Sequence, residues 1–301
     1  MVFEAIVKDI KGKVEFDVPL RDFTSISIGG LARAVVEPVD VEDVRKVIDF
    51  SKNEDIPLLF LGNGTNVLIM DEGFPGVVVR VAPAFGKYWV EDGFIVAEAG
   101  VSLHELIKVS QSKGLSGLEF AIGIPGSVGG AVWINAGANS HSIGDIVEKV
   151  DVITRDLEYK TFERNEIEFD YRSTVFQQRP DFIWKVHLRL REASLEEIKN
   201  NILKFAERRK TQPANLPSAG CIFKNPPGNY AGKLIELAGC KGLRVGGAVV
   251  SSEHANFIVN RGDATSTDVL KLIDIIREKV RRDFGVELEL EIDIKGRGSH
   301  T

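Results

Sequence analysis

The stretch NLPSAGCIFKNPPG, residues 215–228, sets a thiol close to a cation and a side-chain amide: Cys221, Lys224 and Asn225. The chain has only one other cysteine, Cys240, and two are too few for a disulfide framework or a cysteine metal site. Two interpretations of Cys221 stay open at this level. It packs as a small hydrophobic residue, or it donates a proton, since a thiol has an unperturbed pKa of about 8.5.

A glycine-rich segment, GNGTN, spans residues 62–66 and follows a short apolar stretch. Its two glycines permit positive φ and close approach of the backbone to a ligand. Successive N–H groups and the Thr65 hydroxyl could hold a diphosphate in an anion-binding nest. The segment is neither a Walker loop nor a Rossmann fingerprint, because it lacks Gly-Lys-Ser/Thr and a third glycine at the required spacing. A plain turn is the alternative.

A second segment, AIGIPGSVGGAVWINAGA, spans residues 121–138 and is denser in glycine. Glycine costs conformational entropy on folding, so a tract of this kind indicates a surface that needs backbone contact with a ligand. The alternative is an irregular crossing between two lobes of the protein.

Charged residues near the middle and the end of the chain admit ordinary explanations. Arg172, in YRSTVF, could form a surface ion pair. In the C-terminal LELEI region, strand alternation puts Glu287, Glu289 and Glu291 on one face. Such a ladder is ordinarily solvated, and its periodicity does not select one of the three acids.

The elements that must position these residues mix strand and helix patterns. Strands are predicted at residues 32–38, 56–62, 76–81, 94–100, 146–154, 182–191, 247–260 and 286–294. Helices are predicted at residues 41–55, 102–114, 194–210, 230–239 and 266–285. Ser102 is a predicted N-cap, and Gly285 is a predicted stop. The order is not a strict βαβ alternation, so the predicted fold class is α+β. We predict a domain boundary near residues 205–210.

Two predicted helices show a clear apolar face. The first carries Val44, Val47 and Ile48 at helical spacing. The last carries Val269, Leu272, Ile273, Ile276 and Val280.

Composition narrows the class of protein. The chain has 301 residues, 44% of them hydrophobic and 27% charged, as in ordinary globular proteins. A formal net charge of −6 gives no long-range attraction to nucleic acid or to an anionic membrane. No apolar run approaches about 18 residues, and the N-terminus lacks the apolar core of a signal peptide. We therefore expect a cytoplasmic protein with reduced thiols and with no nucleic-acid or membrane partner.

Seven motifs in order resemble one family across nearly the whole chain. They are TSISIGG, GNGTNVLI, GIPGSVGGAVWINAGA, YRSTVF, SAGCIFKNP, AGKLIELAGCKGLRVGGA and LELEI. Together they closely resemble the UDP-N-acetylenolpyruvoylglucosamine reductases, which act in bacterial peptidoglycan precursor synthesis. The resemblance implies a two-lobed FAD-binding unit of the vanillyl-alcohol-oxidase type over residues 1–205, divided near residue 80. It also implies an α+β substrate-binding domain over residues 206–301.

The resemblance gives the two glycine-rich segments a ligand. It implies non-covalent FAD, with NADPH as co-substrate, and it implies that residues of both segments contact the cofactor. These are Gly62, Asn63, Gly64, Thr65, Asn66, Gly123, Pro125, Gly126, Ser127, Gly129, Gly130, Ala136 and Gly137. No metal ion is expected.

The same resemblance assigns the catalytic roles. Arg172 and Glu291 match the residues that stabilise the enolate formed when the substrate alkene accepts a hydride. Cys221 stands where most members have serine, the proton donor to that carbanion. A thiol is a much stronger acid than a hydroxyl, so the role stays chemically feasible for Cys221.

The implied substrate is UDP-N-acetylglucosamine enolpyruvate, a small molecule, and the protein is expected to be a monomer. Tyr171, Lys210 and Asn225 match substrate-contacting positions, although a lysine at the end of a helix is also explained by the helix dipole. The chain resembles the shorter form of the family, which lacks a loop with a substrate-clamping tyrosine.

Two other classes of function stay open. One is an oxidase on the same flavin-binding fold, whose relatives often attach FAD covalently through histidine; His104 and His141 lie in the relevant half of the chain. The other is a nucleotide-binding or regulatory module without catalysis, which would not need Arg172, Cys221 and Glu291.

Overall fold

A computed structural model describes residues 3, 6, 10–82, 84–91, 93–207, 209–210, 212–213 and 216–296. The chain divides into two compact units. The first unit comprises residues 1–15, 34–63 and 76–210, and the second comprises residues 16–33, 64–75 and 211–301. The sequence predicts a functional division at residue 205/206, with all earlier residues in the cofactor-binding part. The structural division differs, because residues 16–33 and 64–75 join the unit that contains the C-terminal segment.

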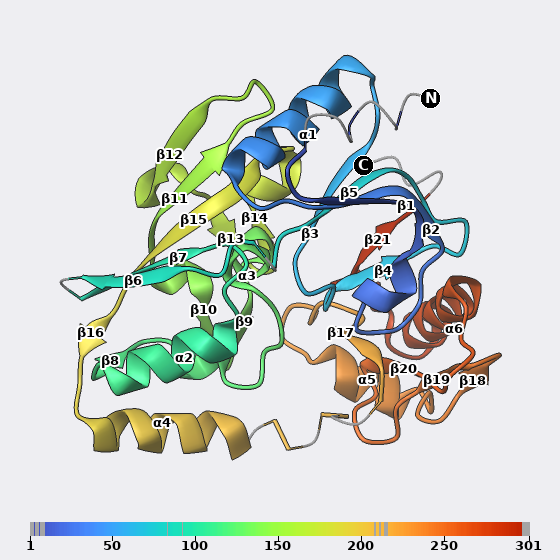
Figure 1. The fold of residues 1–301 in the computed structure, drawn as a ribbon. Helices are drawn as coiled ribbons and strands as arrows, with labels where there is room; N and C mark the ends of the chain where they lie inside the picture. Colours follow the sequence, from blue (N-terminus) through green and yellow to red (C-terminus); the bar gives the residue numbers. More distant parts are fainter. Residues whose placement is uncertain are drawn as a thin grey trace. The chain divides into compact units, whose positions relative to one another are not determined.

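The first unit is built on a five-stranded sheet of order β12–β11–β15–β7–β6 (Figure 1). All neighbouring strands in it run antiparallel. The bounds are β6 Tyr88–Glu91, β7 Phe94–Glu98, β11 Val147–Ile153, β12 Tyr159–Glu163 and β15 Phe182–Arg189. The strands predicted at residues 94–100, 146–154 and 182–191 are confirmed within it.

A four-stranded sheet has the order β1–β2–β5–β3. Its strands are β1 Lys13–Pro19, β2 Leu31–Glu37, β3 Leu58–Leu61 and β5 Phe74–Arg80. Strands β3 and β5 run parallel, with Leu58 opposite Val77. The predicted strands at residues 32–38, 56–62 and 76–81 are therefore present.

Four helices belong to the first unit: α1 Val41–Asn53, α2 Leu103–Ser112, α3 Val128–Ile134 and α4 Leu195–Glu207. The predicted apolar face of α1 is confirmed, since Val44, Val47 and Ile48 are all buried. Ser102 is the N-cap of α2, accepting a hydrogen bond from the N–H of Glu105, as predicted. Helices α2 and α4 lie side by side (Figure 1).

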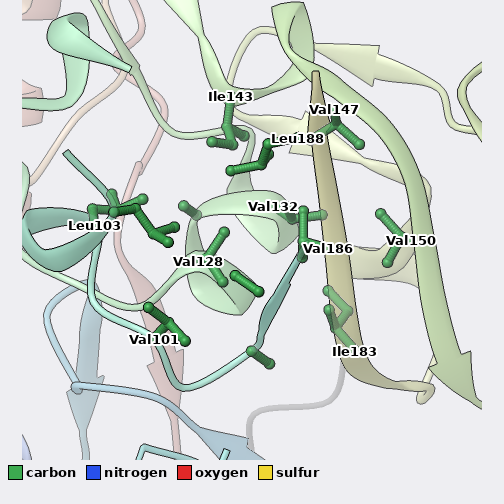
Figure 2. Packing of buried hydrophobic residues seen from close by; sticks show 14 of the residues in the cluster. Val101, Leu103, Val128, Val132, Ile143, Val147, Val150, Ile183, Val186 and Leu188 are labelled. Atoms are coloured by element: carbon green, nitrogen blue, oxygen red, sulfur yellow. The ribbon is translucent and has the colours of Figure 1, made fainter. Parts of the chain in front are cut away.

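Helix α3 carries the second glycine-rich segment into the core of the first unit. Figure 2 shows Val128 and Val132 of α3 among Val101, Val186 and other buried aliphatic side chains. This packing anchors the helix to strand β15 on one side and to the segment before α2 on the other.

Short strand pairs and 3-10 turns complete the first unit. The pairs are β8 Leu115–Ser116 with β16 Arg191–Glu192, β9 Gly137–Ala138 with β10 His141–Ser142, and β13 Phe169–Asp170 with β14 Ser173–Thr174. The 3-10 turns are Glu119–Ala121, Ile143–Asp145, Arg164–Glu166 and Val175–Gln178, and Leu20–Phe23 forms one in the second unit.

The second unit contains a four-stranded sheet of order β17–β20–β19–β18. Its strands are β17 Ser218–Cys221, β18 Arg244–Val245, β19 Ala248–Val250 and β20 Phe257–Asn260. Helices α5 Ala231–Leu237 and α6 Ser266–Phe284 lie beside it (Figure 1). A separate parallel pair joins β4 Val67–Ile69 to β21 Asp293–Lys295.

Helix α6 is fixed at both ends and along one face. Thr265 and Asp268 form a capping box at its N-terminus, and Gly285 ends it with φ of 68°. The Asp71 carboxylate accepts hydrogen bonds from two more N–H groups of its first turn. The predicted apolar face is confirmed: Val269, Leu272, Ile273, Ile276 and Val280 are buried.

The strand predicted over residues 286–294 is wrong in extent. Only Asp293–Lys295 is a strand, and the preceding residues make one isolated bridge, between Leu290 and Phe223. The alternating pattern indicates extended backbone correctly, but a strand also needs a partner along its whole length.

The mixture of helices and sheets confirms the predicted α+β class. Within the described residues, no helix combines the length and apolar character needed to cross a membrane. The same part of the chain contains no group of three or more His, Cys, Asp or Glu side chains arranged to hold a metal ion.

Candidate active site

Helix α3 begins against the segment that precedes α2, inside the first unit. Ser127 is its N-cap, and its buried hydroxyl accepts from the N–H of Gly130. The N–H groups of Val128 and Gly129 donate to the carbonyls of Val101 and Ala99. A Cβ on Gly129 would lie 2.7 Å from the Ala99 Cβ, so packing within the protein requires glycine there.

Gly130 differs from its neighbour, because nothing in the described part of the chain requires a glycine at that position. It is exposed, and a Cβ there would lie no closer than 3.6 Å to Ser127 Oγ. Gly123 and Pro125, earlier in the same segment, are also exposed. The backbone at Gly130 is open to a flat cofactor, whereas the Arg209 side chain lies against Gly123 and donates to its carbonyl. The open backbone at Gly130 fits the predicted FAD contact.

The two glycine-rich segments meet within the first unit at one point. A Cβ on Gly62 would lie 2.7 Å from Ser127 Oγ, so the start of GNGTN lies against the N-cap of α3. Gly62 and Asn63 belong to the first unit, whereas residues 64–66 belong to the second. The proximity of Gly62 and Ser127 supports a shared role for the two segments.

Gly64 is tightly constrained in the second unit. Its φ is +61°, and a Cβ would overlap the carbonyl oxygen of Phe23. Its own carbonyl accepts hydrogen bonds from the N–H and the hydroxyl of Ser25, at 2.9 and 3.2 Å.

Gly64→Ala is therefore expected to lower the free energy of unfolding by about 1–3 kcal/mol, the cost of left-handed backbone for a residue with a Cβ. Urea denaturation of the FAD-free protein measures it. Gly130→Ala is the matched variant. It should leave that free energy unchanged or slightly higher, because Gly130 lies in helix α3, and it should weaken FAD binding. Equal destabilisation by the two substitutions would contradict this distinction.

Asn66 ties the GNGTN segment to the C-terminal segment of the second unit. Its Nδ2 donates to the Glu291 carbonyl at 3.1 Å, and its own carbonyl accepts from the Asp293 N–H at 3.0 Å. Asn66 was predicted as a cofactor contact, which stays a prediction. The structure gives its side chain a role in holding the backbone beside Glu291.

Cys221 and Glu291 lie on neighbouring segments of the second unit. Cys221 is half-buried at the end of β17, opposite Phe257. The N–H of Glu291 donates to the carbonyl of Ile222, the next residue after Cys221, at 2.8 Å. Cys221 and Glu291 are far apart in the sequence, but Glu291 is hydrogen-bonded to the residue that directly follows Cys221.

The second cysteine has a different environment. Cys240 is fully buried, and burial raises the pKa of its thiol. Neither cysteine forms a disulfide in the described part of the chain. Of the two thiols, Cys221 is the one that solvent and a ligand can reach.

The structure separates Glu291 from its two neighbours in the acidic ladder. The side chains of Glu287 and Glu289 are 69% and 78% exposed, and they pair with Arg281 and Lys224. Glu291 is only partly exposed. It is the one acid of the ladder that the protein partly covers.

Arg172 is held in a strained turn of the first unit. It lies between β13 and β14 with φ of 54°, in the left-handed region. Its Nη2 donates to the Gly137 carbonyl at 2.8 Å, and its guanidinium lies 5.3 Å from the centre of the Tyr171 ring. Gly137, which accepts this hydrogen bond, is also one of the predicted FAD contacts. The Arg172 cation is thus anchored at the end of the segment predicted to contact FAD.

Asn135 holds this arrangement together and was missed by the sequence interpretation. It is buried, in the left-handed region, at the C-terminus of α3. Its Nδ2 donates to the Asp170 carbonyl, and its Oδ1 accepts from the Gly144 N–H. Asparagine at a helix end is the signal that could have identified it.

The predicted substrate contacts are less distinctive. Lys210 pairs with Glu207 on an exposed surface, and Tyr171 is 45% exposed. The Oδ1 of Asn225 accepts from the N–H of Ala231, at the start of α5. Tyr171, Lys210 and Arg172 belong to the first unit, and Asn225 belongs to the second with Cys221 and Glu291.

His254 lies near the Cys221 strand and gives the second unit a pH dependence. Its Nδ1 accepts from the N–H of Asn256, and its ring packs edge-on against Phe257. Burial lowers its pKa, and nearby Lys241 adds to that shift, while Glu236 opposes it. Since the unfolded chain binds the proton near pH 6.5, folding stability should fall as pH drops below that value.

The variant His254→Gln is expected to lose less stability than the wild type between pH 7 and about pH 5, because it removes this proton uptake. Urea denaturation at each pH measures the difference. Parallel curves for the two proteins would show that His254 contributes nothing to the dependence.

Comparison with known proteins assigns most of these residues to two matched domains. A family model described as UDP-N-acetylenolpyruvoylglucosamine reductase, C-terminal domain, matches residues 212–295, and one described as FAD binding domain matches residues 32–162. The chain therefore contains an FAD-binding domain followed by a reductase C-terminal domain, as predicted. All of the predicted cofactor contacts lie within residues 32–162, the FAD-binding match, and Cys221, Asn225 and Glu291 lie within residues 212–295, the C-terminal match.

Individual relatives match almost the full length. UDP-N-acetylenolpyruvoylglucosamine reductases of Caldanaerobacter subterraneus and Moorella thermoacetica are 42% and 43% identical over 287 and 290 residues. These alignments cover 95% and 96% of this chain and 95% of each relative. The crystal structure of the reductase from Thermus caldophilus is 38% identical, with a TM-score of 0.83, over 95% of this chain and 100% of that one.

Proposed function

Because the chain belongs to the UDP-N-acetylenolpyruvoylglucosamine reductase family, we propose that it uses NADPH to reduce UDP-N-acetylglucosamine enolpyruvate to UDP-N-acetylmuramate. Members of the family are oxidoreductases of peptidoglycan precursor synthesis, and this chain is one of them. The observation that supports the proposal most is the hydrogen bond from the Glu291 N–H to the carbonyl of Ile222, the residue after Cys221. It sets an acid close to a group that can stabilise negative charge, and reduction of an alkene needs both.

FAD, when bound, supplies the hydride for such a reduction. The residues proposed to hold it are residues 62–66 of the first segment and, in the second segment, Gly123, Pro125, Gly126, Ser127, Gly129, Gly130, Ala136 and Gly137. The exposed backbone at Gly130 and the approach of Gly62 to Ser127 support this assignment. We propose that the cofactor is bound without a covalent link.

Arg172 is proposed to bind the substrate carboxylate. Hydride addition to the enolpyruvyl group places negative charge on the carbon next to that carboxylate, as an enolate. A guanidinium is permanently charged and planar, so it suits a carboxylate whose charge is growing. The anchor of Nη2 on the Gly137 carbonyl limits the rotation of the guanidinium, which supports a preorganised role.

Cys221 is proposed to protonate the carbanion. Glu291 is proposed to assist in stabilising the enolate by donating a hydrogen bond from a protonated carboxyl group, because an ionised carboxylate would repel the negative charge. The Cys221 thiol is half-buried. Loss of the proton to carbon leaves a thiolate, which regains a proton from solvent before the next turnover. Tyr171, Lys210 and Asn225 are proposed substrate contacts.

An anaerobic experiment tests the proposal in two steps. NADPH should bleach the bound flavin, and addition of UDP-N-acetylglucosamine enolpyruvate should restore its colour. Absence of bleaching would favour a non-catalytic binding module. If acid precipitation kept the yellow colour in the pellet, the covalent-flavin oxidase would be favoured instead.

A further inference from the structure

The strand that carries Cys221 keeps the same partner segment for one residue beyond the cysteine, and a side chain then replaces the partner backbone. Up to Cys221, β17 pairs with β20, with an irregularity between Ser218 and Cys221 where Gly220 has φ of 79°. From Ile222 onward, the backbone bonds to Asn256, which precedes β20. The N–H of Ile222 donates to the Asn256 carbonyl at 2.8 Å.

The Asn256 side chain then takes over both polar groups of the next residue. Its Oδ1 accepts from the Phe223 N–H at 3.0 Å, and its Nδ2 donates to the Phe223 carbonyl at 2.8 Å. Asn256 is 3% exposed, and Phe223 is 1% exposed, so both bonds are shielded from water. A buried amide with both functions bonded to one residue works as a substitute for a neighbouring strand.

The opposite edge of the same segment faces the C-terminal segment. Phe223 lies opposite Leu290, the Lys224 N–H donates to the Glu289 carbonyl, and the Glu291 N–H donates to the Ile222 carbonyl. Residues 222–224 are therefore held from both sides. Asn256 occupies one edge, and the backbone next to Glu291 occupies the other.

We propose that Asn256 is a positioning residue for the reaction, fixing the register of the segment that connects Cys221 to Glu291. The inference rests on the proposed roles of those two residues. Without the amide, the two polar groups of Phe223 lose their buried partners, and the segment can shift in register or open locally. Cys221 would then be displaced from the carbon that it protonates.

The test uses the FAD-loaded full chain with Asn256→Ala and Asn256→Asp. The aspartate has the same shape and keeps the acceptor for the Phe223 N–H, but when ionised it lacks the donor to the Phe223 carbonyl. Asn260→Ala is the matched control. Asn260 is equally buried and lies on β20, but its amide holds Ile26, Gly262 and Ala264.

Two readouts are expected to move together in Asn256→Ala. Alkylation of Cys221 by iodoacetamide should be faster, because local opening exposes the thiol, while buried Cys240 serves as an internal reference. Reoxidation of reduced flavin by the enolpyruvyl substrate should slow by about tenfold to hundredfold, whereas bleaching by NADPH should not change. Asn256→Asp should also change both readouts, because it sets a buried carboxylate oxygen against the Phe223 carbonyl. Asn260→Ala should lose stability without altering either readout.

Wild-type values of alkylation and reoxidation in both Asn256 variants would overturn the proposal, as would equal changes in Asn260→Ala. If Asn256→Ala does not fold, Asn256→Asp decides the outcome. Failure of the proposed function looks different, because the wild-type enzyme itself would then show no substrate-dependent reoxidation. The alkylation comparison would still report whether Asn256 fixes the strand.

Discussion

Replacing Cys221 with alanine is expected to slow product formation by about 10²–10⁴-fold, the contribution of a positioned general acid. The methyl side chain cannot give a proton to the carbanion, so the intermediate must wait for solvent. Bleaching of the flavin by NADPH should be unaffected, because no proton from Cys221 takes part in it. Anaerobic stopped-flow absorbance separates these two half-reactions.

The companion variant Cys221→Ser identifies the chemistry of the acid. The motif resemblance implies serine at this position in most members of the family, so Cys221→Ser should retain substantial activity. Cys240→Ala controls for the loss of a thiol, since Cys240 is buried in the core of the second unit and should affect only stability. Wild-type product formation by Cys221→Ala would remove Cys221 from the mechanism.

The apolar periodicity of the sequence located the packed elements because burial repeats with the geometry of the element. The face of α6 from Val269 to Val280 is buried as predicted, and the same is true of α1. Such faces depend only on the spacing of apolar residues along the chain, and this spacing can be read directly from the sequence.

The acidic ladder shows where this reasoning stops. Alternation put Glu287, Glu289 and Glu291 on one face but could not rank them. Their ranking depends on tertiary contacts: two form exposed ion pairs, and the third lies beside the Cys221 segment. The length of the C-terminal strand failed for the same reason, since the partner segment at Phe223 meets this stretch at a single bridge.

Sequence patterns alone did not identify two buried asparagines, for a related reason. Asn135 and Asn256 are valuable because of the carbonyl and N–H groups that they meet, and these come from residues distant in the sequence. A polar residue inside an apolar stretch is one local sign of such a role, and for Asn135 its place at a helix end is a second. Both lie in stretches of this kind, WINAG and HANFIV.

Replacing Arg172 with lysine is expected to reduce the rate of flavin reoxidation by substrate about 10²–10³-fold, comparable to removal of one preorganised donor at a developing anion. In the wild type, Nη2 donates to the Gly137 carbonyl at 2.8 Å and Nη1 to the Asn135 carbonyl at 3.5 Å, so two carbonyls orient the planar group. A lysine ammonium offers one charged nitrogen, so it cannot keep this anchor and also form a bidentate contact with a carboxylate. Pre-steady-state and steady-state kinetics with the enolpyruvyl substrate measure the loss.

The control is Arg164→Lys, in the same unit. Arg164 packs over Phe169 and donates to the Ile167 carbonyl, away from Gly137. It should leave reoxidation unchanged. Wild-type reoxidation by Arg172→Lys would show that the fork geometry of the guanidinium plays no part in the reaction.

Arg172→Gly separates catalysis from folding at the same position. The φ of 54° is costly for arginine and acceptable for glycine. The free energy of unfolding of the glycine variant, measured by urea denaturation, is therefore expected to be about 1 kcal/mol higher than that of the wild type. It should nevertheless be inactive with the enolpyruvyl substrate. An arginine kept only for structure would give the reverse result: glycine would lower stability, because it removes the bond to the Gly137 carbonyl, and it would leave activity intact. Strain retained at Arg172 is explained if the turn exists to hold its guanidinium at the Gly137 carbonyl.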